Sequence, residues 1–137
     1  MQFRDIDEAR RFYGGILGLS EGRSAATWVD FNFYGHQYVC HLNSAIGESG
    51  TLRSHTNPVD RNEVPVPHYG VVVEMDNWQR LTDCLRASGI TFLNEPHLRF
   101  EAQAGEQATL FLLDPSGNAL EFKAFRDIDK QLFDPGK

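Results

Sequence analysis

The sequence lacks several features that mark whole classes of protein. It has only two cysteines, Cys40 and Cys84, and neither belongs to a Cys-x-x-Cys pair. It has no apolar run approaching the ~20 residues that a membrane-spanning helix needs. The first five residues do not begin the apolar core of a signal peptide. Basic residues are in deficit, with 13 Lys and Arg against 19 Asp and Glu.

These absences exclude classes of function. A net charge of −6 argues against a nucleic-acid-binding protein, which would carry a basic stripe. We expect no membrane association and a location in the cytoplasm, where both cysteines would remain reduced and buried. The 137 residues, 41% hydrophobic and 23% charged, are typical of a soluble globular protein with one compact domain or two small halves.

The chain contains two halves with the same order of elements. Asp5 and Glu8 have the spacing of a capping box, and the helix that follows is expected to end at Gly18. A second helix is expected from Asp76, as its cap, to Gly89. In both halves the glycine comes thirteen residues after the aspartate. The apolar face of the second helix consists of Trp78, Leu81 and Leu85.

Strand-like segments surround each helix and predict the fold class. They are 26–33 and 37–43 in the first half, and 68–75, 91–94, 109–113 and 119–125 in the second. Only four residues precede the first helix, so the opening strand of the first half is expected to be incomplete. The order predicts an α+β fold of two tandem β-α-β-β-β modules, which form a curved mixed sheet around a cleft with the helices outside.

The predicted boundaries divide one domain, 1–137, into four parts. These are a first module at 1–45, a connecting loop at 46–66, a second module at 67–126 and a C-terminal tail at 127–137. The stretch from Asn43 to Pro67 is rich in Gly, Ser, Asn and Pro, which is typical of a long loop and compatible with a lid.

Three strands each carry one ligand-type side chain on the face that points away from the helices, because side chains alternate along a strand. After the Asp-Pro-Ser-Gly turn at Asp114, Glu121 interrupts an apolar strand. A carboxylate turned inward there costs of order 2–7 kcal/mol of desolvation unless something pairs with it. By the same alternation, the candidate metal ligands are His41, His68 and Glu121.

Two neutral imidazoles and one carboxylate suit one divalent ion with open positions: Zn, Ni, Co, Mn or Fe(II). Such an ion acts as a Lewis acid on substrate oxygens. The alternative is that neither histidine is a ligand: His68 would be satisfied by backbone groups at the start of its strand, and His41 would only form hydrogen bonds. The remaining histidines, His36, His55 and His97, fall in turns or loops and are expected to be solvated. His55, in the loop that could act as a lid, could reach a substrate.

The order of the elements resembles the vicinal oxygen chelate superfamily, which includes glyoxalase I, extradiol dioxygenases, bleomycin-resistance proteins and fosfomycin-resistance transferases. The matching segments are Asp5–Gly18, Tyr38–Leu42, His68–Met75 and Asp114–Phe122. The resemblance implies four strand positions for ligands, of which His41, His68 and Glu121 match the second, third and fourth. The first would precede residue 1. The resemblance also implies a homodimer.

The leading hypothesis is a metal-dependent small-molecule enzyme, a lyase or isomerase of the glyoxalase type, with Glu121 as the base. The alternatives are a metal-free drug- or metabolite-binding protein of the bleomycin-resistance type and an Fe(II) extradiol-type dioxygenase. Side chains of the predicted cleft could contact the substrate. The candidates are Arg23, Trp28, Asn32, Arg53, Arg99, Gln107 and Lys123.

Overall fold

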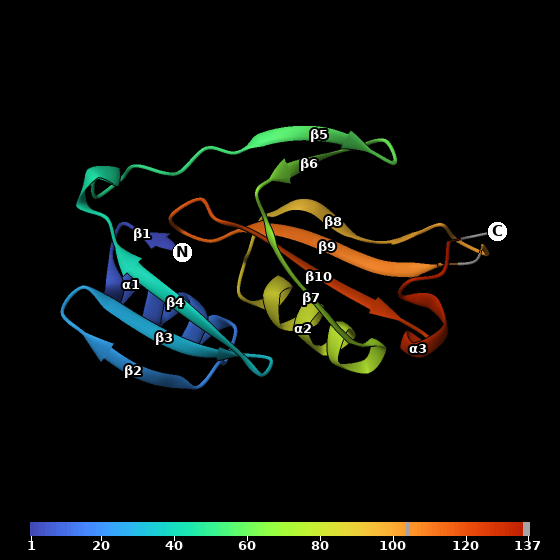
Figure 1. The fold of residues 1–137 in the computed structure, drawn as a ribbon, viewed down its shortest axis with the longest axis horizontal. Coiled ribbons are helices and arrows are strands. Elements are labelled where there is room, and N and C mark those ends of the chain that lie inside the picture. The colour runs from blue at the N-terminus through green and yellow to red at the C-terminus, as the bar shows by residue number, and fades with distance from the viewer. Residues whose placement is uncertain (104, 136–137) are drawn as a thin grey trace. The chain divides into compact units, whose positions relative to one another are not determined.

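The computed structural model describes residues 1–103 and 105–135 and divides the chain into two compact units (Figure 1). The first unit consists of Met1–Arg53 with Leu113–Asn118. The second consists of Ser54–Leu112 with Ala119–Lys137. The short segment 113–118, which joins two strands of the second unit, therefore packs with the first.

The first unit contains a four-stranded sheet in the order β1-β4-β3-β2, with β1 parallel to β4 and the other pairs antiparallel. Its strands are β1 (Gln2–Phe3), β2 (Glu21–Ala25), β3 (Trp28–Phe33) and β4 (His36–Leu42). Its helical segments are α1 (Ile6–Ala9), a π-helix (Arg10–Ile16) and a 3₁₀ turn (Ser44–Ile46). The module thus has the predicted β-α-β-β-β order.

The second unit repeats this topology, with the sheet order β7-β10-β9-β8 and with β7 parallel to β10. Its strands are β7 (Tyr69–Glu74), β8 (Phe92–Arg99), β9 (Gln107–Leu113) and β10 (Ala119–Phe125). Its helices are α2 (Met75–Ala87) and α3 (Ile128–Gln131). The same order of strands in both sheets confirms the α+β class and the two β-α-β-β-β modules.

The two helices begin differently from one another. The Asp5 side chain accepts a 2.7 Å hydrogen bond from the Glu8 backbone N–H, as predicted, but the Glu8 carboxylate pairs with Arg4 rather than closing the box. The predicted cap at Asp76 is wrong. Helix α2 starts at Met75, its N-cap is Glu74 without a side-chain bond, and Asp76 lies in the first turn.

Two regions contain more strand than the sequence predicted. The segment Glu21–Ala25 forms β2, which is exposed along its whole length and so has no apolar alternation to reveal it. The predicted loop 46–66 contains a hairpin, β5 (His55–Val59) with β6 (Asn62–Val66). Its turn residues, Asp60 and Arg61, have positive φ angles of 47° and 66°, which is the geometry that suits a two-residue hairpin turn. Neither residue is glycine.

The Asp114 turn stabilises the first unit through a buried hydrogen-bond network. Its carboxylate accepts bonds from the backbone N–H groups of Ser116 and Asn118 and from the Tyr13 hydroxyl at 2.8 Å. Burial raises the pKa of Asp114 and raises that of Tyr13 well above its usual value. The turn also fits closely against the chain, because a Cβ at Gly117 would lie 2.5 Å from the Leu52 carbonyl oxygen.

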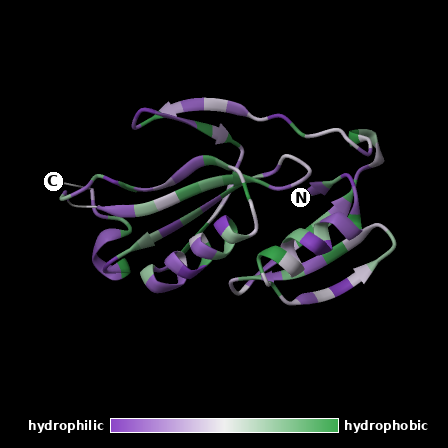
Figure 2. Ribbon diagram, turned by 180° about the vertical axis from the view of Figure 1, so that it is seen from behind, coloured by the Kyte–Doolittle hydropathy of each residue, from purple (hydrophilic) through white to green (hydrophobic). Residues whose placement is uncertain are grey.

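Each sheet has a helix-covered face and an opposite face. In the second unit α2 packs against β7 and β10, and the Trp78 indole donates a 2.9 Å bond to the Phe122 carbonyl. The buried face of α2 includes the predicted Trp78, Leu81 and Leu85. Figure 2 shows the result as hydrophobic and hydrophilic bands alternating along the helix. Because side chains alternate between the two faces of a strand, the polar side chains of β10 lie on the face opposite α2.

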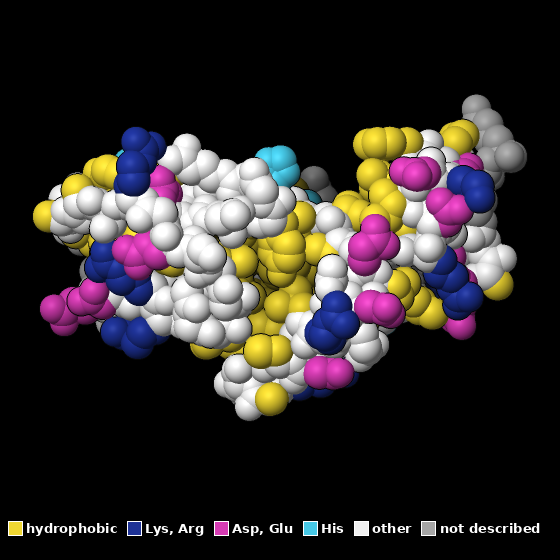
Figure 3. Space-filling model, turned by 90° about the horizontal axis from the view of Figure 1, so that it is seen from below, with side chains coloured by type: hydrophobic (Ala, Val, Ile, Leu, Met, Phe, Trp, Pro, Cys, Tyr) yellow, Lys and Arg dark blue, Asp and Glu magenta, His cyan; other side chains and the backbone are white. Residues whose placement is uncertain are grey.

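The surface carries charges of both signs. In Figure 3, acidic and basic side chains lie interspersed at both ends of the face that is seen. Within the described part of the chain, no helix has the length and apolarity required to cross a membrane.

Replacing Asp114 should destabilise the fold strongly. In Asp114→Ala, four donors lose a buried acceptor, the Asn118 side-chain amide among them, and we expect the free energy of unfolding to fall by about 2–4 kcal/mol in urea denaturation. Asp83→Ala removes an exposed carboxylate that accepts a hydrogen bond from the Gln79 side chain. This substitution should change the free energy of unfolding by less than about 0.5 kcal/mol. Equal effects of the two substitutions would contradict the assignment of a stabilising role to the turn.

The two thiols should differ in reactivity. Cys40 is buried as predicted, and burial raises its pKa to about 12, whereas Cys84 is exposed on the outer side of α2, contrary to prediction. We expect a disulfide reagent at pH 8 to label one thiol in the native protein and two after denaturation. Cys84→Ser should remove the native labelling. Rapid native labelling of that variant would show that Cys40 is accessible.

Candidate functional site

Two of the predicted metal ligands meet in the second unit. Glu121 lies on β10 directly beside Gly70 of the parallel strand β7, and His68 lies two residues before Gly70. The His68 Nε2 atom is 3.3 Å from the Glu121 Oε2 atom. The imidazole and the carboxylate thus approach each other at the edge of the sheet, where β7 is the outermost strand.

The His68 ring is held in one orientation. Its Nδ1 atom lies 2.8 Å from the Pro65 carbonyl oxygen, which can only accept, so Nδ1 carries the proton. The ring also packs edge-on against Phe111, with centroids 5.2 Å apart. A neutral His68 therefore presents the lone pair of Nε2 to the carboxylate, which is the arrangement of a metal-ligating histidine.

Glu121 is a buried carboxylate, with 6% of its side chain exposed. Its Oε1 atom accepts a 3.0 Å hydrogen bond from the Thr109 hydroxyl and lies 3.4 Å from the Lys123 ammonium nitrogen. Its Oε2 atom faces His68. One oxygen is thus occupied by protein donors, and the other faces His68 Nε2, where a proton on the ring or a bound metal ion would complete the pair.

The His68–Glu121 pair fits a divalent ion by its chemistry, since imidazole nitrogen and carboxylate oxygen are ligands of Zn, Ni, Co, Mn and Fe(II). Across residues 1–103 and 105–135, no group of three or more His, Cys, Asp or Glu side chains is placed to hold a metal ion. The pair by itself supplies two ligands, and a complete site requires further ones.

The third predicted ligand, His41, belongs to the first unit. It lies on β4 opposite Gln2 of the parallel strand β1, and its backbone N–H donates to the Met1 carbonyl at 2.8 Å. Its neighbour Cys40 is buried, so His41 is on the face away from the helix. Because β4 pairs with β1 as β10 pairs with β7, His41 lies on the strand of the first module that corresponds to the Glu121 strand of the second.

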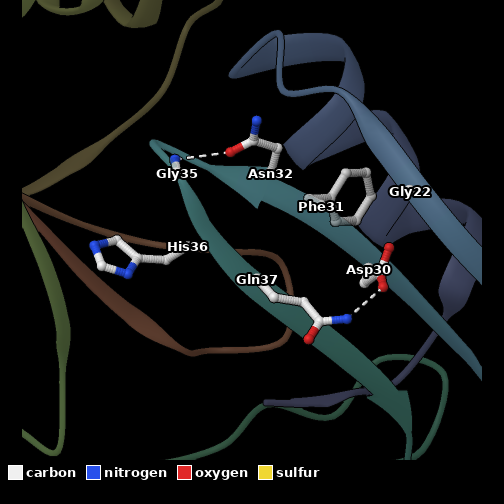
Figure 4. A pocket seen from close by; sticks show the side chains of 7 residues that line it. All are labelled: Gly22, Asp30, Phe31, Asn32, Gly35, His36 and Gln37. Carbon is white, nitrogen blue, oxygen red and sulfur yellow. Dashed lines mark hydrogen bonds between the residues drawn. The ribbon is translucent and has the colours of Figure 1, made fainter.

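The substrate-contact candidates of the first unit lie on its sheet or after it. Trp28 is directly opposite His41 in the β3–β4 ladder. Asn32 lines a pocket of about 280 Å³, where its Oδ1 atom accepts from the Gly35 N–H (Figure 4). Arg23 is largely exposed, and Arg53 is exposed outside any strand.

Asp30 is a buried acid that the sequence analysis missed. It lines the Asn32 pocket, and its carboxylate accepts 2.7 Å and 2.6 Å bonds from the Gln37 amide and the Arg23 backbone N–H (Figure 4). The bond from Gln37 lowers the pKa of Asp30. Because the charge is already compensated within the ladder, Asp30 serves the structure of the sheet.

The candidates of the second unit lie on the same sheet face as Glu121. Lys123 contacts Glu121 as described above. Arg99 and Gln107 form a cross-strand pair on β8 and β9, and both are 9% exposed. The Arg99 Nε atom lies 3.4 Å from a carboxylate oxygen of Asp60, at the hairpin turn. This ion pair connects the hairpin to the sheet that carries Glu121.

Thr109 is the site residue that sequence analysis missed. Its hydroxyl contacts Glu121, and its strand was predicted, but the predicted site residues include no hydroxyl side chain. The signal was present, because Thr109 is a polar residue in the run Thr-Leu-Phe-Leu-Leu, as Glu121 is in its own strand.

Comparison with known proteins gives a family match. The family model for the Glyoxalase/Bleomycin resistance protein/Dioxygenase superfamily matches residues 1–122. No curated protein matches the sequence.

Several solved structures are similar over nearly the whole chain. A glyoxalase/bleomycin resistance protein/dioxygenase from Alicyclobacillus acidocaldarius is 30% identical, with a TM-score of 0.76, over 97% of this chain and 92% of its own. The fosfomycin resistance protein FosX from Listeria monocytogenes is 13% identical, with a TM-score of 0.67, covering 96% and 92%. A lactoylglutathione lyase from Agrobacterium tumefaciens is 18% identical, with a TM-score of 0.60, covering 92% and 90%. The last two likenesses show the fold alone.

Proposed function

The chain belongs to the glyoxalase/bleomycin resistance protein/dioxygenase superfamily, and on that premise we propose that it is a divalent-metal-dependent small-molecule enzyme, a lyase or isomerase of the glyoxalase type. The observation that carries the proposal is the His68–Glu121 pair. A lone pair on Nε2 and a carboxylate oxygen 3.3 Å apart repel one another unless a proton or a metal ion lies between them.

The protein's own residues would hold the ion and the substrate. His68 and Glu121 are the proposed ligands in the second unit, and His41 is the proposed ligand in the first. Bound there, a divalent ion would supply Lewis-acid chemistry to a substrate with two adjacent oxygens. Thr109 holds Glu121 in place through Oε1, as outer-shell partners of ligands do.

Glu121 is also the proposed catalytic base. Its carboxylate is nearly buried, so a proton removed from the substrate would be accepted in a water-poor environment. The Lys123 ammonium nitrogen lies 3.4 Å from Oε1 and is placed to attract substrate oxygens. We propose Trp28 and Asn32 as further substrate contacts. We also propose that the protein works as a homodimer in the cytoplasm.

A second function is favoured by one observation, the Lys123–Glu121 ion pair. The ammonium group balances the buried carboxylate without a metal, and a protonated His68 would satisfy the other oxygen. With both carboxylate oxygens of Glu121 paired in this way, the sheet face that carries Glu121 could serve as the wall of a metal-free drug- or metabolite-binding site. The two functions differ in whether Glu121 needs a metal ion.

Metal content separates the two. We expect protein repleted with Zn, Ni, Co, Mn or Fe(II), then desalted, to retain about one ion per chain by elemental mass spectrometry. Glu121→Ala should lose it. Thr109→Val removes only the hydroxyl behind Glu121 and should weaken metal affinity by about 10-fold or more. Lys123→Met, the matched control, removes the competing cation and should retain the metal.

The opposite pattern would support the binding protein. A wild type that stays empty with every metal, while its circular dichroism spectrum shows a folded chain, would contradict the enzyme proposal. Metal retained by Glu121→Ala would remove Glu121 from the site. Unfolding of each variant in urea must be measured in parallel, because lost metal is informative only in a folded chain.

A further inference from the structure

Arg99 is a nearly buried cation on the sheet face that carries Glu121. Its side chain is 9% exposed, and the residue lies opposite Gln107 in the β8–β9 ladder. Gln107 precedes Thr109 by two residues on β9, and the Thr109 hydroxyl contacts Glu121. Because side chains alternate along a strand, Arg99 and Glu121 lie on one face. Their backbone positions are roughly 12 Å apart, given the rise along a strand and the spacing between strands.

The Arg99 guanidinium forms few hydrogen bonds for so buried a group. Its Nε atom donates to the Asp60 carboxylate at 3.4 Å, and within the described part of the chain it has no other acceptor. Arg4 provides a comparison, because its side chain is 17% exposed and donates to both Glu8 carboxylate oxygens and to the Gly50 carbonyl. Both Nη groups of Arg99 are thus left without a protein acceptor.

These Nη groups are open to solvent. Among the described residues, the side-chain nitrogen and oxygen atoms that are both fully enclosed and unpartnered are Thr82 Oγ1 and Gln107 Oε1. The Nη groups of Arg99 lack a partner but are not enclosed, so an anion can reach them. A planar guanidinium binds carboxylate and phosphate oxygens through two parallel N–H bonds, which a single contact through Nε does not provide.

Asp60 holds Arg99 through a weak contact. The residue lies in the turn of the β5–β6 hairpin, its side chain is 41% exposed, and its bond to Arg99 is long. Figure 1 shows the hairpin alongside β8, the strand that ends at Arg99. The hairpin is loosely held, since β5 is exposed along its length and β6 buries only Val64 and Pro65. A two-stranded hairpin has little stability of its own, so an oxyanion can displace Asp60 and release the turn.

We propose that Arg99 binds an anionic group of the substrate, a carboxylate or a phosphoryl group, and that Asp60 takes the place of this group in the free protein. The substrate oxygens would accept from both Nη groups, and the turn of the hairpin would move away from the sheet. The assignment of the anionic group to the substrate rests on the proposed function of Glu121. The binding of an oxyanion by Arg99 does not.

Inorganic phosphate and acetate are the probes, each titrated into the full chain without added metal at constant ionic strength. We expect saturable ¹H–¹⁵N NMR shifts with both anions at the backbone amides of residues 60–61 and 99–100. The anion that binds more tightly identifies the substrate group as phosphoryl or carboxylate. Arg99→Gln should lose the saturable shifts.

Asp60→Asn tests the competition directly. Asparagine tolerates positive φ, so the variant retains the turn and loses only the charge. Removing an ion pair with an exposed partner should tighten phosphate binding about fivefold.

Arg126→Gln is the matched control. Arg126 also pairs with a carboxylate, that of Glu106 at 3.1 Å, but its side chain is 73% exposed. Its loss should leave phosphate binding at the same amides unchanged. The inference is overturned if Asp60→Asn binds phosphate no more tightly than wild type, if Arg99→Gln binds it equally well, or if wild type gives no saturable shifts. Each of those results would make Arg99 an anchor of the hairpin only. Since the titration contains no metal, a failure of the metal proposal would not affect it.

Discussion

The burial of the Glu121 carboxylate is the constraint on which the proposed chemistry depends. A charge that is 6% exposed on an apolar strand must be balanced within the fold, and three neighbours share the task. Thr109 and Lys123 serve one oxygen, and His68 faces the other. Since the Pro65 carbonyl fixes the proton of His68 on Nδ1, the gap between Nε2 and Oε2 requires a cation. Whether that cation is a proton or a metal ion decides between a binding protein and an enzyme.

The repeated module gives each half of the chain the same division between a helix-covered sheet face and an open one. Each module covers one sheet face with a helix, so polar side chains on the last strand, His41 on β4 and Glu121 on β10, point to the opposite face. Each of those residues is next to the parallel first strand of its own module.

Much of the fold could be predicted from local patterns. The Asp5 cap, the apolar face of α2 and the limits of β10 agree with their periodicity, because each depends on residues adjacent in sequence. The hairpin within 46–66 could not be predicted, since Arg61 stands where a turn with positive φ at both central residues usually has glycine. Strand β2 was missed because both of its faces are exposed, and Cys84 because the exposed side of a helix tolerates a small apolar residue.

The sequence by itself determined the modules, the strand faces and the residue types of the site, because alternation along a strand is a local property. Only the tertiary structure decided which groups meet. The approach of His68 to Glu121 depends on a parallel pairing between strands some fifty residues apart in the chain. The proton position on His68 depends on the Pro65 carbonyl, which comes from the hairpin. Hydrogen-bond geometry is set by packing between distant segments, and a linear pattern does not contain it.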